Sequence, residues 1–448
     1  MFGPQVRVNL PELRRRIPKR YPIRFYPDIT HSITSEFSVN DWDVAYAMTE
    51  EREVINPRPI DEAHIFRILQ PYADAGFLTY SEGCNDDVNK FVWSALGWDP
   101  DVDITTALRD FGRYFIGPDM ADDFAQGLLA LERNWRGPLL ANTGVDVTLA
   151  QFQAMEGRAT PQQKLNWRFQ EALYRAHYDA YVRTRLLDET DRERRALEFL
   201  KAGNSDAARR ELTPEPQAKP GAALRARVFE LAEALFQSIH MQLSVPRYAA
   251  ISAGRGANLD LIDRPITNAP FILAHLNEPN VILNWTNPGP GGFYDDLGDP
   301  MNRPHLDPGV GFEKDPAFAH TIRTDFGSSR RDGLRISWRR HADALYGNSL
   351  KLHYNGLDPA ARYRVRYIQP NEAGTRATRL VANDKWEIRP MQRGEAEKPL
   401  EFDIPADATT GGKLTLEWQA NPEEAGNGRF VQVSEVWLLR VPSAIIGK

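Results

Sequence analysis

Apolar and polar residues follow three different patterns along the chain. Over residues 1–102, strand-like runs at 22–27 and 76–81 are each followed by helical segments, which predicts βα units with a parallel sheet. Over residues 103–257, apolar residues recur mostly every three or four positions, as is typical of amphipathic helices. Residues 258–448 contain short alternating runs separated by turn sequences, which predicts an antiparallel β-sandwich.

The sandwich assignment depends on a series of short candidate strands. Turn-forming pairs such as Asn355-Gly356 and Gly411-Gly412 lie between them. Before most of them, residues 287–300 form a long stretch with little strand or helix character, and such loops are often functional. The candidate strands are Val281–Trp285, Leu334–Trp338, Leu350–Tyr354, Tyr363–Ile368, Leu400–Ile404, Leu414–Trp418 and Val431–Leu439.

The composition is that of a globular protein that is not built to bind nucleic acid. Of the 448 residues, 42% are hydrophobic and 26% are charged, which is typical of folded domains. The formal net charge is −6, so the chain has no overall positive field for a nucleic acid or an anionic membrane. No run reaches the ~18 apolar residues that span a bilayer, so no membrane span is expected.

Motifs for cofactors are also missing from the sequence. The single cysteine, Cys84, excludes an internal disulfide and a zinc site built from cysteine pairs. There is no phosphate-binding loop, dinucleotide glycine pattern or nucleophile elbow, so we expect no cofactor. No signal peptide is visible after Met1, and the compartment and oligomeric state stay open.

Polar residues gather at the ends of the two predicted N-terminal strands. Asp28 and His31 follow the first strand, whereas Glu82 and the run Asn85–Lys90 follow the second. In parallel βα architectures, functional side chains lie where strands end. Two carboxylates beside aromatic residues suit glycoside hydrolysis, because one protonates the leaving oxygen while the other attacks or activates water. We therefore expect Asp28 and Glu82 to be the catalytic carboxylates.

Further polar and aromatic side chains are expected to contact a carbohydrate substrate. Phe293 and Tyr294, in the 287–300 stretch, are expected to border a sugar site. No metal site is expected, although the carboxylates of Asp295, Asp296 and Asp299 offer ligands that could hold Ca²⁺. The other expected substrate-binding residues are His31, Trp42, Tyr80, Asn85, Asp86 and Asp87.

Each N-terminal candidate also has a structural interpretation, and the sequence leaves both open. Asp28 could hydrogen-bond the loop that follows it, and Glu82 could pair with an arginine. Asn85 or Asp86 could cap the next helix, as Asp41 or Asp43 could cap an earlier one. Asp87 would lie in a first helical turn, where negative charge favours the helix dipole, and His31 could be a buried structural histidine.

The quoted residues resemble part of a known group of enzymes. The stretch from Phe2-Gly3-Pro4 through Tyr26–His31 to Tyr80–Asp87 is similar to the closing part of a (β/α)₈ barrel. The barrels in question belong to bacterial glycoside hydrolases of the hexosaminidase and α-glucuronidase type. A helical region and a terminal β-sandwich often follow such barrels, and the order here is the same. Residues 430–438 look like the last strand of a galactose-binding-like jelly roll.

The resemblance implies a multidomain chain with α/β, all-α and all-β parts. These parts are a partial (β/α)-barrel segment in 1–102, a helical domain in 103–257, and a jelly-roll-like, carbohydrate-binding sandwich in 258–448. The implied function is a glycoside hydrolase acting on oligo- or polysaccharide. Because only two or three βα units fit before residue 103, we expect an N-terminally truncated product, which would be secreted or periplasmic. Alternatively, these units form a smaller mixed domain.

Two other functions are compatible with the same residues. A non-catalytic carbohydrate-binding or scaffolding protein is the main alternative, with the sandwich as its sugar-binding part. A carbohydrate lyase or esterase would use the same strand-end sites.

Overall fold

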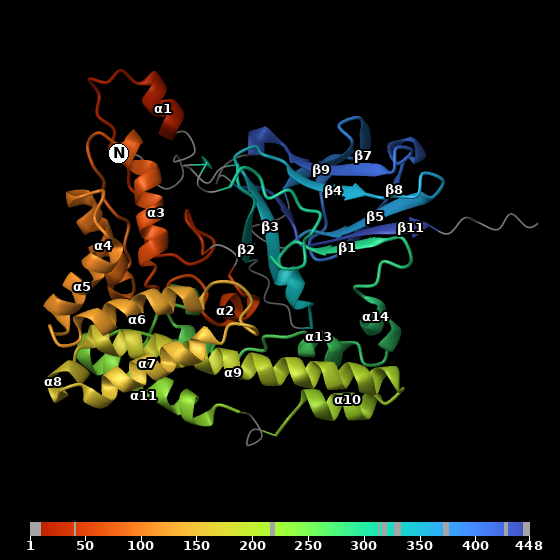
Figure 1. Cartoon of the computed structure of the whole chain (residues 1–448). Helices are drawn as coiled ribbons and strands as arrows, with labels where there is room; N and C mark the ends of the chain where they lie inside the picture. The colour runs from red at the N-terminus through yellow and green to blue at the C-terminus, as the bar shows by residue number, and fades with distance from the viewer. Residues whose placement is uncertain are drawn as a thin grey trace, which may run out of the picture. The chain divides into compact units, whose positions relative to one another are not determined.

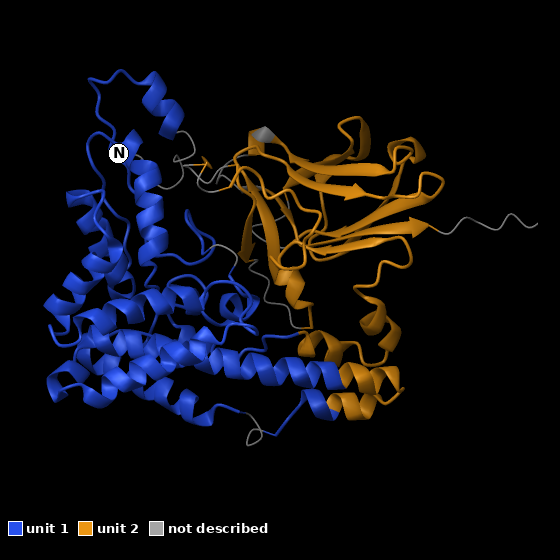
Figure 2. Ribbon diagram, in the orientation of Figure 1, with its two compact units in different colours: residues 1–195, 210–267 blue, residues 196–209, 268–448 orange. Residues whose placement is uncertain are grey.

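The protein is described by a computed structural model with two compact units (Figure 2). Unit 1 contains residues 1–195 and 210–267, and unit 2 contains residues 196–209 and 268–448. Helices dominate unit 1 and antiparallel sheets dominate unit 2, so the chain is a mixed multidomain protein (Figure 1). The division into three domains stays a prediction. The described residues are 10–39, 42–215, 220–311, 314–315, 320–326, 333–370, 376–424 and 429–441.

Unit 1 is built largely from helices joined by loops. The helices predicted around residues 43–51, 61–73 and 85–96 are confirmed as α2, α3 and α4. Among the described residues, no helix is both long and apolar enough to cross a bilayer. The helices are α1 (Leu10–Arg16), α2 (Val44–Thr49), α3 (Pro59–Leu69), α4 (Asp87–Trp98), α5 (Ile104–Phe115), α6 (Ala121–Asn134), α7 (Gly144–Arg158), α8 (Pro161–Lys164), α9 (Trp167–Lys201), α10 (Ser205–Leu212), α11 (Ala222–Ile239) and α12 (Val245–Tyr248). The end of α9 and the start of α10, within residues 196–209, belong to unit 2.

Helix α9 runs for 35 residues without a glycine or proline, so nothing in its sequence interrupts the helix. Its residue Arg175 is only 1% exposed. The Arg175 guanidinium donates to Asp179 at 2.8 and 2.9 Å and to the carbonyl of Ile55 at 2.7 Å, and it lies 3.9 Å from the ring centre of Trp135. Because a buried charge is costly unless it is paired, Arg175 holds the chain around Ile55 against α9.

The two strands predicted near the N-terminus are extended segments rather than regular strands. They run in parallel, as expected, but pair only through isolated bridges between Phe25 and Phe77 and between Asp28 and Tyr80. Tyr80 donates its backbone N–H to the Pro27 carbonyl at 2.7 Å. Proline has no N–H, so Pro27 accepts in this pairing but cannot donate, and a continuous ladder does not form. Phe2, Gly3 and Pro4 lie outside the described residues.

The described residues of unit 2 form three antiparallel sheets. One sheet has the strand order β1-β11-β5-β8, the second β10-β3-β2 and the third β4-β9-β6-β7. The strands are β1 (Phe293–Asp296), β2 (Arg323–Phe326), β3 (Arg340–Leu345), β4 (Leu350–Asn355), β5 (Arg362–Ile368), β6 (Ala377–Ala382), β7 (Trp386–Arg393), β8 (Pro399–Ile404), β9 (Lys413–Ala420), β10 (Arg429–Val433) and β11 (Glu435–Val441).

Inward-facing residues of these sheets share one hydrophobic core. In β4, Leu350, Leu352 and Tyr354 are buried and alternate with more exposed neighbours, which is the pattern of a strand with one face on a core. Val365 of β5 and Leu416 of β9 belong to the same buried cluster. The four predicted strands with this alternation are confirmed as β4, β5, β8 and β9.

Two predicted strands are wrong, and a third is divided. Val281–Trp285 lies mostly in helix α14 (Pro279–Asn284), because proline suits the first turn of a helix. Leu334–Trp338 leads into a 3₁₀ turn at Ile336–Arg339. The predicted strand Val431–Leu439 consists of β10 and β11, which are separated by Ser434.

Several strands were not predicted from the sequence, because their apolar and polar residues do not alternate clearly. All six residues of β3 are buried, including the charged Arg340 and Asp343, so the strand shows no polar face. Strand β1 lies inside the 287–300 stretch, where little strand character was expected. Strands β2, β6 and β7 were also missed.

Glu435, the first residue of β11, is a fully buried carboxylate that joins several parts of unit 2. It accepts hydrogen bonds from the hydroxyls of Tyr294 at 2.6 Å and Ser337 at 2.8 Å. The indole N–H groups of Trp285 and Trp338 donate to it at 3.2 and 2.6 Å. Its ion pair with Arg335, at 3.1 Å, adds a charged donor. These contacts explain why the apolar runs that end in the two tryptophans pack here without forming strands.

α13 (Ala269–Ala274) precedes α14 in this part of the chain.

We expect Glu435→Ala to lower the free energy of unfolding of unit 2 by about 3–5 kcal/mol, because buried Arg335 and four other donors lose their acceptor. Urea titration followed by circular dichroism measures the loss. The control is Glu401→Ala, which removes ion pairs with Arg364 and Arg366 on the surface and should cost less than about 1 kcal/mol. Equal losses in the two variants would contradict the interpretation.

Glu62 on α3 is a buried carboxyl whose shifted pKa makes the stability of unit 1 depend on pH. It accepts a hydrogen bond from the Trp93 indole at 2.7 Å, and its other oxygen has no hydrogen-bond partner. Burial raises the pKa of Glu62 to about 8, although the positive charge of Arg58 opposes the shift. A carboxyl whose pKa is raised by folding stabilises the fold below its unfolded pKa, near 4.5, and this contribution is lost as pH rises through about 8.

We therefore expect Glu62→Gln, which mimics the protonated acid, to match the parent protein at pH 5 and to be more stable by a few kcal/mol at pH 9. Thermal unfolding at both pH values measures the difference. Glu198→Gln, at an exposed carboxylate, should show no such gain. A Glu62→Gln variant that is less stable at pH 9 would show that the buried carboxyl is ionised and well paired.

Candidate active site

The polar segments expected to carry the site lie side by side in unit 1. The parallel bridge between Asp28 and Tyr80 places their ends together. The backbone N–H of Glu82 donates to the Thr30 hydroxyl at 3.1 Å, and Ile29 donates to the Tyr80 carbonyl at 3.3 Å. The structure thus brings Asp28 and Glu82 to one region, as the parallel arrangement predicts.

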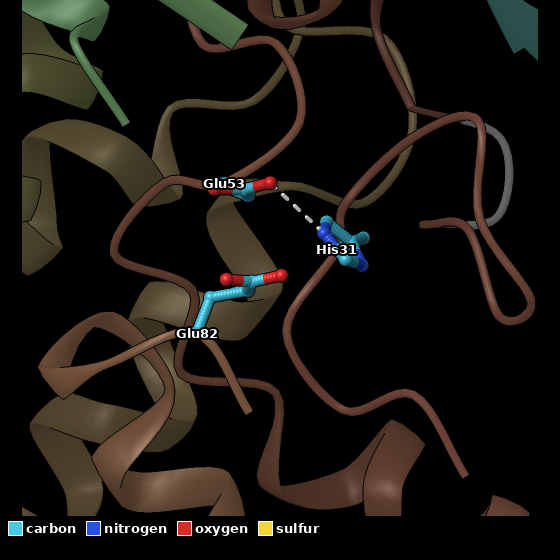
Figure 3. A group of neighbouring side chains, drawn as sticks. All are labelled: His31, Glu53 and Glu82. Atoms are coloured by element: carbon cyan, nitrogen blue, oxygen red, sulfur yellow. Dashed lines mark hydrogen bonds and ion pairs between the residues drawn. The ribbon is translucent and has the colours of Figure 1, made fainter. Parts of the chain in front are cut away.

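Four ionisable side chains contact one another at this point, and Arg52 lies beside them with Nη1 at 3.9 Å from Glu53 Oε1. His31 Nε2 lies 3.1 Å from Glu53 Oε1, and Figure 3 shows His31, Glu53 and Glu82 facing one another. The guanidinium of Arg255 bridges the two carboxylates, with Nη1 at 3.0 Å from Glu53 Oε1 and Nη2 at 3.2 Å from Glu82 Oε2. The side chain of Glu53 is 6% exposed and that of Glu82 is 18% exposed, so Glu82 is the more accessible carboxylate. We call His31, Glu53, Glu82 and Arg255 the charged cluster.

Asp28 contacts the charged cluster through the second ring nitrogen of His31. Its carboxylate accepts hydrogen bonds from His31 Nδ1 at 2.7 Å and from the backbone N–H groups of Thr30 and His31 at 3.1 and 3.2 Å. Burial acts to raise the pKa of Asp28, but these hydrogen bonds hold it below its usual value. Burial likewise acts to lower the pKa of His31, but hydrogen bonds to Asp28 and Glu53 raise it. The contacts of Asp28 are therefore those of a group that orients and charges His31.

Tyr80 and Glu82 form the open side of the cluster. The Tyr80 hydroxyl donates to Glu82, and this hydrogen bond raises the pKa of Tyr80 to about 12. The Tyr80 ring stacks on His31 with a centroid distance of 5.7 Å. Tyr80 thus holds both the imidazole and the accessible carboxylate in place.

Sequence analysis missed Glu53 and Arg255. Glu53 lies in the charged run Glu50–Glu53 after helix α2, where no strand or motif distinguishes it from a solvated residue. Arg255 lies between Gly254 and Gly256, and this stretch contains no complete glycine motif or other signal of a site. Their roles depend on tertiary contacts between segments about 170 to 200 residues apart, as the separation of 173 between Glu82 and Arg255 illustrates.

Asp86 has structural partners. The Thr30 hydroxyl donates to it, Ser81 donates at 3.0 Å, and Lys90 Nζ lies 3.0 Å away. Burial raises the pKa of Asp86 despite these partners. Asp86 occupies the N-cap position of α4, but its side chain makes no capping hydrogen bond there.

Asn85 and Asp87 line a small pocket beside the start of α4. Arg168 and Glu171 of helix α9 also line it, and Arg168 Nε donates to Asp87 at 2.7 Å. Glu171 is 6% exposed, one of its oxygens has no hydrogen-bond partner, and burial raises its pKa well above the usual value. Substrate binding by Asn85 and Asp87 stays a prediction.

The remaining N-terminal candidate, Trp42, lies in a packed aromatic cluster. It is 1% exposed, and its ring centroid lies 4.6 Å from that of Trp135. Asp43 caps helix α2 by accepting the Ala45 N–H at 2.8 Å, whereas Asp41 lies outside the described residues. These contacts give Trp42 a packing role in the structure.

The candidates from the 287–300 stretch belong to unit 2. Phe293 packs against Tyr354 and His305, with ring centroids 5.5 and 5.1 Å away, while the Tyr294 hydroxyl donates to Glu435. Asp295 is fully buried and accepts hydrogen bonds from His305 and Tyr354.

The carboxylates proposed for Ca²⁺ show local turn contacts. Asp296 accepts the Gly298 N–H at 3.1 Å, and Asp299 accepts the Met301 N–H at 2.9 Å. Within the described part of the chain, Asp295, Asp296 and Asp299 do not form a group of three ligands within reach of one ion. The group that meets this criterion is His31, Glu53 and Glu82, with one ligand atom of each within 4.8 Å of the others.

Comparison with known proteins gives little guidance. No family model matches the sequence, and no curated protein matches it. Among solved structures, the chain is similar to a family GH115 4-O-methyl-α-glucuronidase with specificity for decorated arabinogalactans. That alignment has a TM-score of 0.30 and 9% identity, and covers 93% of this chain and 51% of the other. The chain thus spans about half the length of that enzyme, and a TM-score of this size does not establish a shared fold.

Asn89, on the first turn of α4, is buried and connects two segments of the chain through its side-chain amide. Its side-chain N–H groups donate to the carbonyls of Ile29 and Asn56, both at 3.0 Å, and its oxygen accepts the Arg58 N–H at 2.9 Å. It thereby joins the segment before His31 to the segment after Glu53.

We expect Asn89→Ala to lower the free energy of unfolding by about 2–3 kcal/mol, because three buried backbone groups lose their partner. Thermal or urea unfolding measures the change. Ser94→Ala, on the exposed side of the same helix, should stay within about 0.5 kcal/mol of the parent. If Asn89→Ala behaved like Ser94→Ala, the hydrogen bonds of Asn89 would not be what joins the two segments.

Proposed function

We propose that the chain carries a glycoside hydrolase site that acts on oligo- or polysaccharide, with Glu82 as the reacting carboxylate. The observation that carries the proposal is the pairing of two carboxylates, Glu53 and Glu82, with one oxygen of each within 4.8 Å of the other. Retaining glycosidases hold their two carboxyl groups about 5–5.5 Å apart, whereas inverting enzymes need about 6.5–9.5 Å. The short separation favours retention of configuration.

The charges around the pair suit the two roles that retention requires. Glu82 is the more accessible carboxylate and forms an ion pair with Arg255, so it can reach the sugar as the nucleophile. Glu53 is hydrogen-bonded to His31, and the hydrogen bonds to Asp28 and Glu53 raise the pKa of this imidazole against the effect of burial. The His31–Glu53 pair can therefore supply the proton that the leaving oxygen takes up. Asp28 acts through His31 by orienting it.

The wider architecture is part of the same proposal. The parallel segments before residue 103 would form part of a (β/α) barrel, followed by a helical domain and a jelly-roll-like sandwich. A sandwich of this type would bind carbohydrate or support the enzyme. The other site candidates, including Asn85, Asp86, Asp87 and Tyr80, would contact sugar hydroxyls around the carboxylates.

Glu82→Gln tests the catalytic role. We expect the full chain to hydrolyse members of a panel of aryl glycosides and polysaccharides, and the variant to lose at least about 100-fold in turnover. Its melting temperature should stay nearly unchanged, because the side chain is partly exposed. The matched control is Glu51→Gln, a nearby carboxylate that pairs with Arg264 at 2.9 Å, and it should keep parent activity.

Two results would contradict the proposal. A Glu82→Gln variant with parent turnover would exclude Glu82 as the reacting group. A parent chain that cleaves none of the substrates but is retarded in polysaccharide gels would favour the carbohydrate-binding alternative. For an active chain, NMR of the first-formed product distinguishes retention, the expected outcome, from inversion.

A further inference from the structure

We propose that His31, Glu53 and Glu82 form a binding site for a divalent transition-metal ion, and that Arg255 occupies this position when the ion is absent. The proposal goes beyond hydrolysis, because it concerns which cation the cluster binds and does not require a sugar to be cleaved. It is argued from the spacing of the ligand atoms, the orientation of the histidine and the position of the arginine.

The ligand atoms are close to the spacing that a metal ion needs. An ion with ligand distances of about 2.1 Å separates neighbouring ligand atoms by about 3.0–3.4 Å, depending on geometry. His31 Nε2 and Glu53 Oε1 are 3.1 Å apart, within this range. Glu82 also offers an oxygen within 4.8 Å of one ligand atom of His31 and one of Glu53. Because Glu82 is the most exposed of the three, a small side-chain rotation can bring it to ligand distance.

The histidine is held in the orientation of a metal ligand. Metal-binding histidines usually donate the proton of their second ring nitrogen to a carboxylate, which fixes the ring and its tautomer. His31 makes this contact through Nδ1 to Asp28 at 2.7 Å, so Nε2 is directed to the two glutamates. With a side chain 2% exposed, His31 is not aimed at solvent. The stacked Tyr80 ring further limits its rotation.

Arg255 shows that the site attracts positive charge. Its guanidinium contacts both glutamates and thereby neutralises part of their combined charge of −2. The Arg255 side chain is 40% exposed, so it can leave the cluster for solvent without unfolding buried structure. A divalent ion would balance the two carboxylates completely, which removes the cost of two adjacent, partly buried negative charges.

The ligand set selects the class of ion. One imidazole nitrogen with two carboxylates suits zinc, cobalt or manganese, whereas calcium and magnesium prefer oxygen ligands alone. Because Glu82 would be a ligand, a bound ion and the proposed hydrolysis would compete for the same carboxylate. Metal binding is therefore measured directly, without an activity assay.

The experiment titrates the full chain, stripped with a chelator and dialysed, with Co²⁺ and Zn²⁺. Visible absorption reports inner-sphere Co²⁺ ligation, and calorimetry gives the stoichiometry and Kd for Zn²⁺. We expect one site per chain, lost in Glu82→Gln and His31→Asn, and about 10- to 100-fold weaker in Asp28→Asn. Arg255→Gln should bind several-fold to about tenfold more tightly, because it removes the competing ion pairs.

His353→Asn is the control for adventitious binding. His353 is 48% exposed and lies 3.6 Å from Asp307, so it represents an ordinary surface histidine beside a carboxylate. The control variant should bind Zn²⁺ like the parent. Absence of one-to-one binding in both the parent and Arg255→Gln would overturn the proposal, as would binding that survives in Glu82→Gln. Glu82 and Arg255 are partly exposed, so these outcomes do not depend on a variant that fails to fold. A glycosidase without metal binding, or metal binding without glycosidase activity, separates this proposal from the proposed function.

Discussion

The pairing of one buried arginine governs the geometry of unit 1. Arg175 on α9 cannot stay charged in the interior without partners, and Asp179, the Trp135 ring and the carbonyl of Ile55 supply them. The Ile55 carbonyl belongs to the segment carrying Glu53, and so does Glu50, whose carboxylate lies 3.8 Å from Arg175 Nε. The position of the candidate site therefore depends on a helix that contributes nothing to the charged cluster itself.

Within the site, each buried polar group is stabilised by a hydrogen bond or an ion pair with its neighbour. From Asp28 to His31, Glu53, Arg255 and Glu82, each group makes a hydrogen bond or an ion pair with the next. Such a series keeps two carboxylates close together without requiring either to be neutral. It also leaves the outermost member, Glu82, with one face towards solvent. A nucleophile and a metal ligand both need this combination of close neighbours and access.

Some of this arrangement follows from local sequence, and some does not. The alternation in Leu350–Tyr354 predicts a strand because side-chain direction repeats every two residues. In contrast, Val281–Trp285 has the composition of a strand but follows a proline that favours a helix, so composition alone gave the wrong element. The closeness of Asp28 to the second polar segment was predictable from parallel pairing. Glu53 and Arg255 were not, because only long-range packing brings them there.

The candidate site can assemble only after residues far downstream of His31 and Glu53 have been synthesised. Residues that carry His31 and Glu53 leave the ribosome early, yet Ile55 is fixed by Arg175, 120 positions later. The contact between Glu50 and Asn258 spans 208 positions, and Arg255 is comparably remote. Since contacts between distant positions form slowly, the early segments must remain unassembled while α9 and the residues beyond it emerge. During this interval a nascent chain exposes apolar N-terminal segments that the finished fold buries, and such exposure favours aggregation.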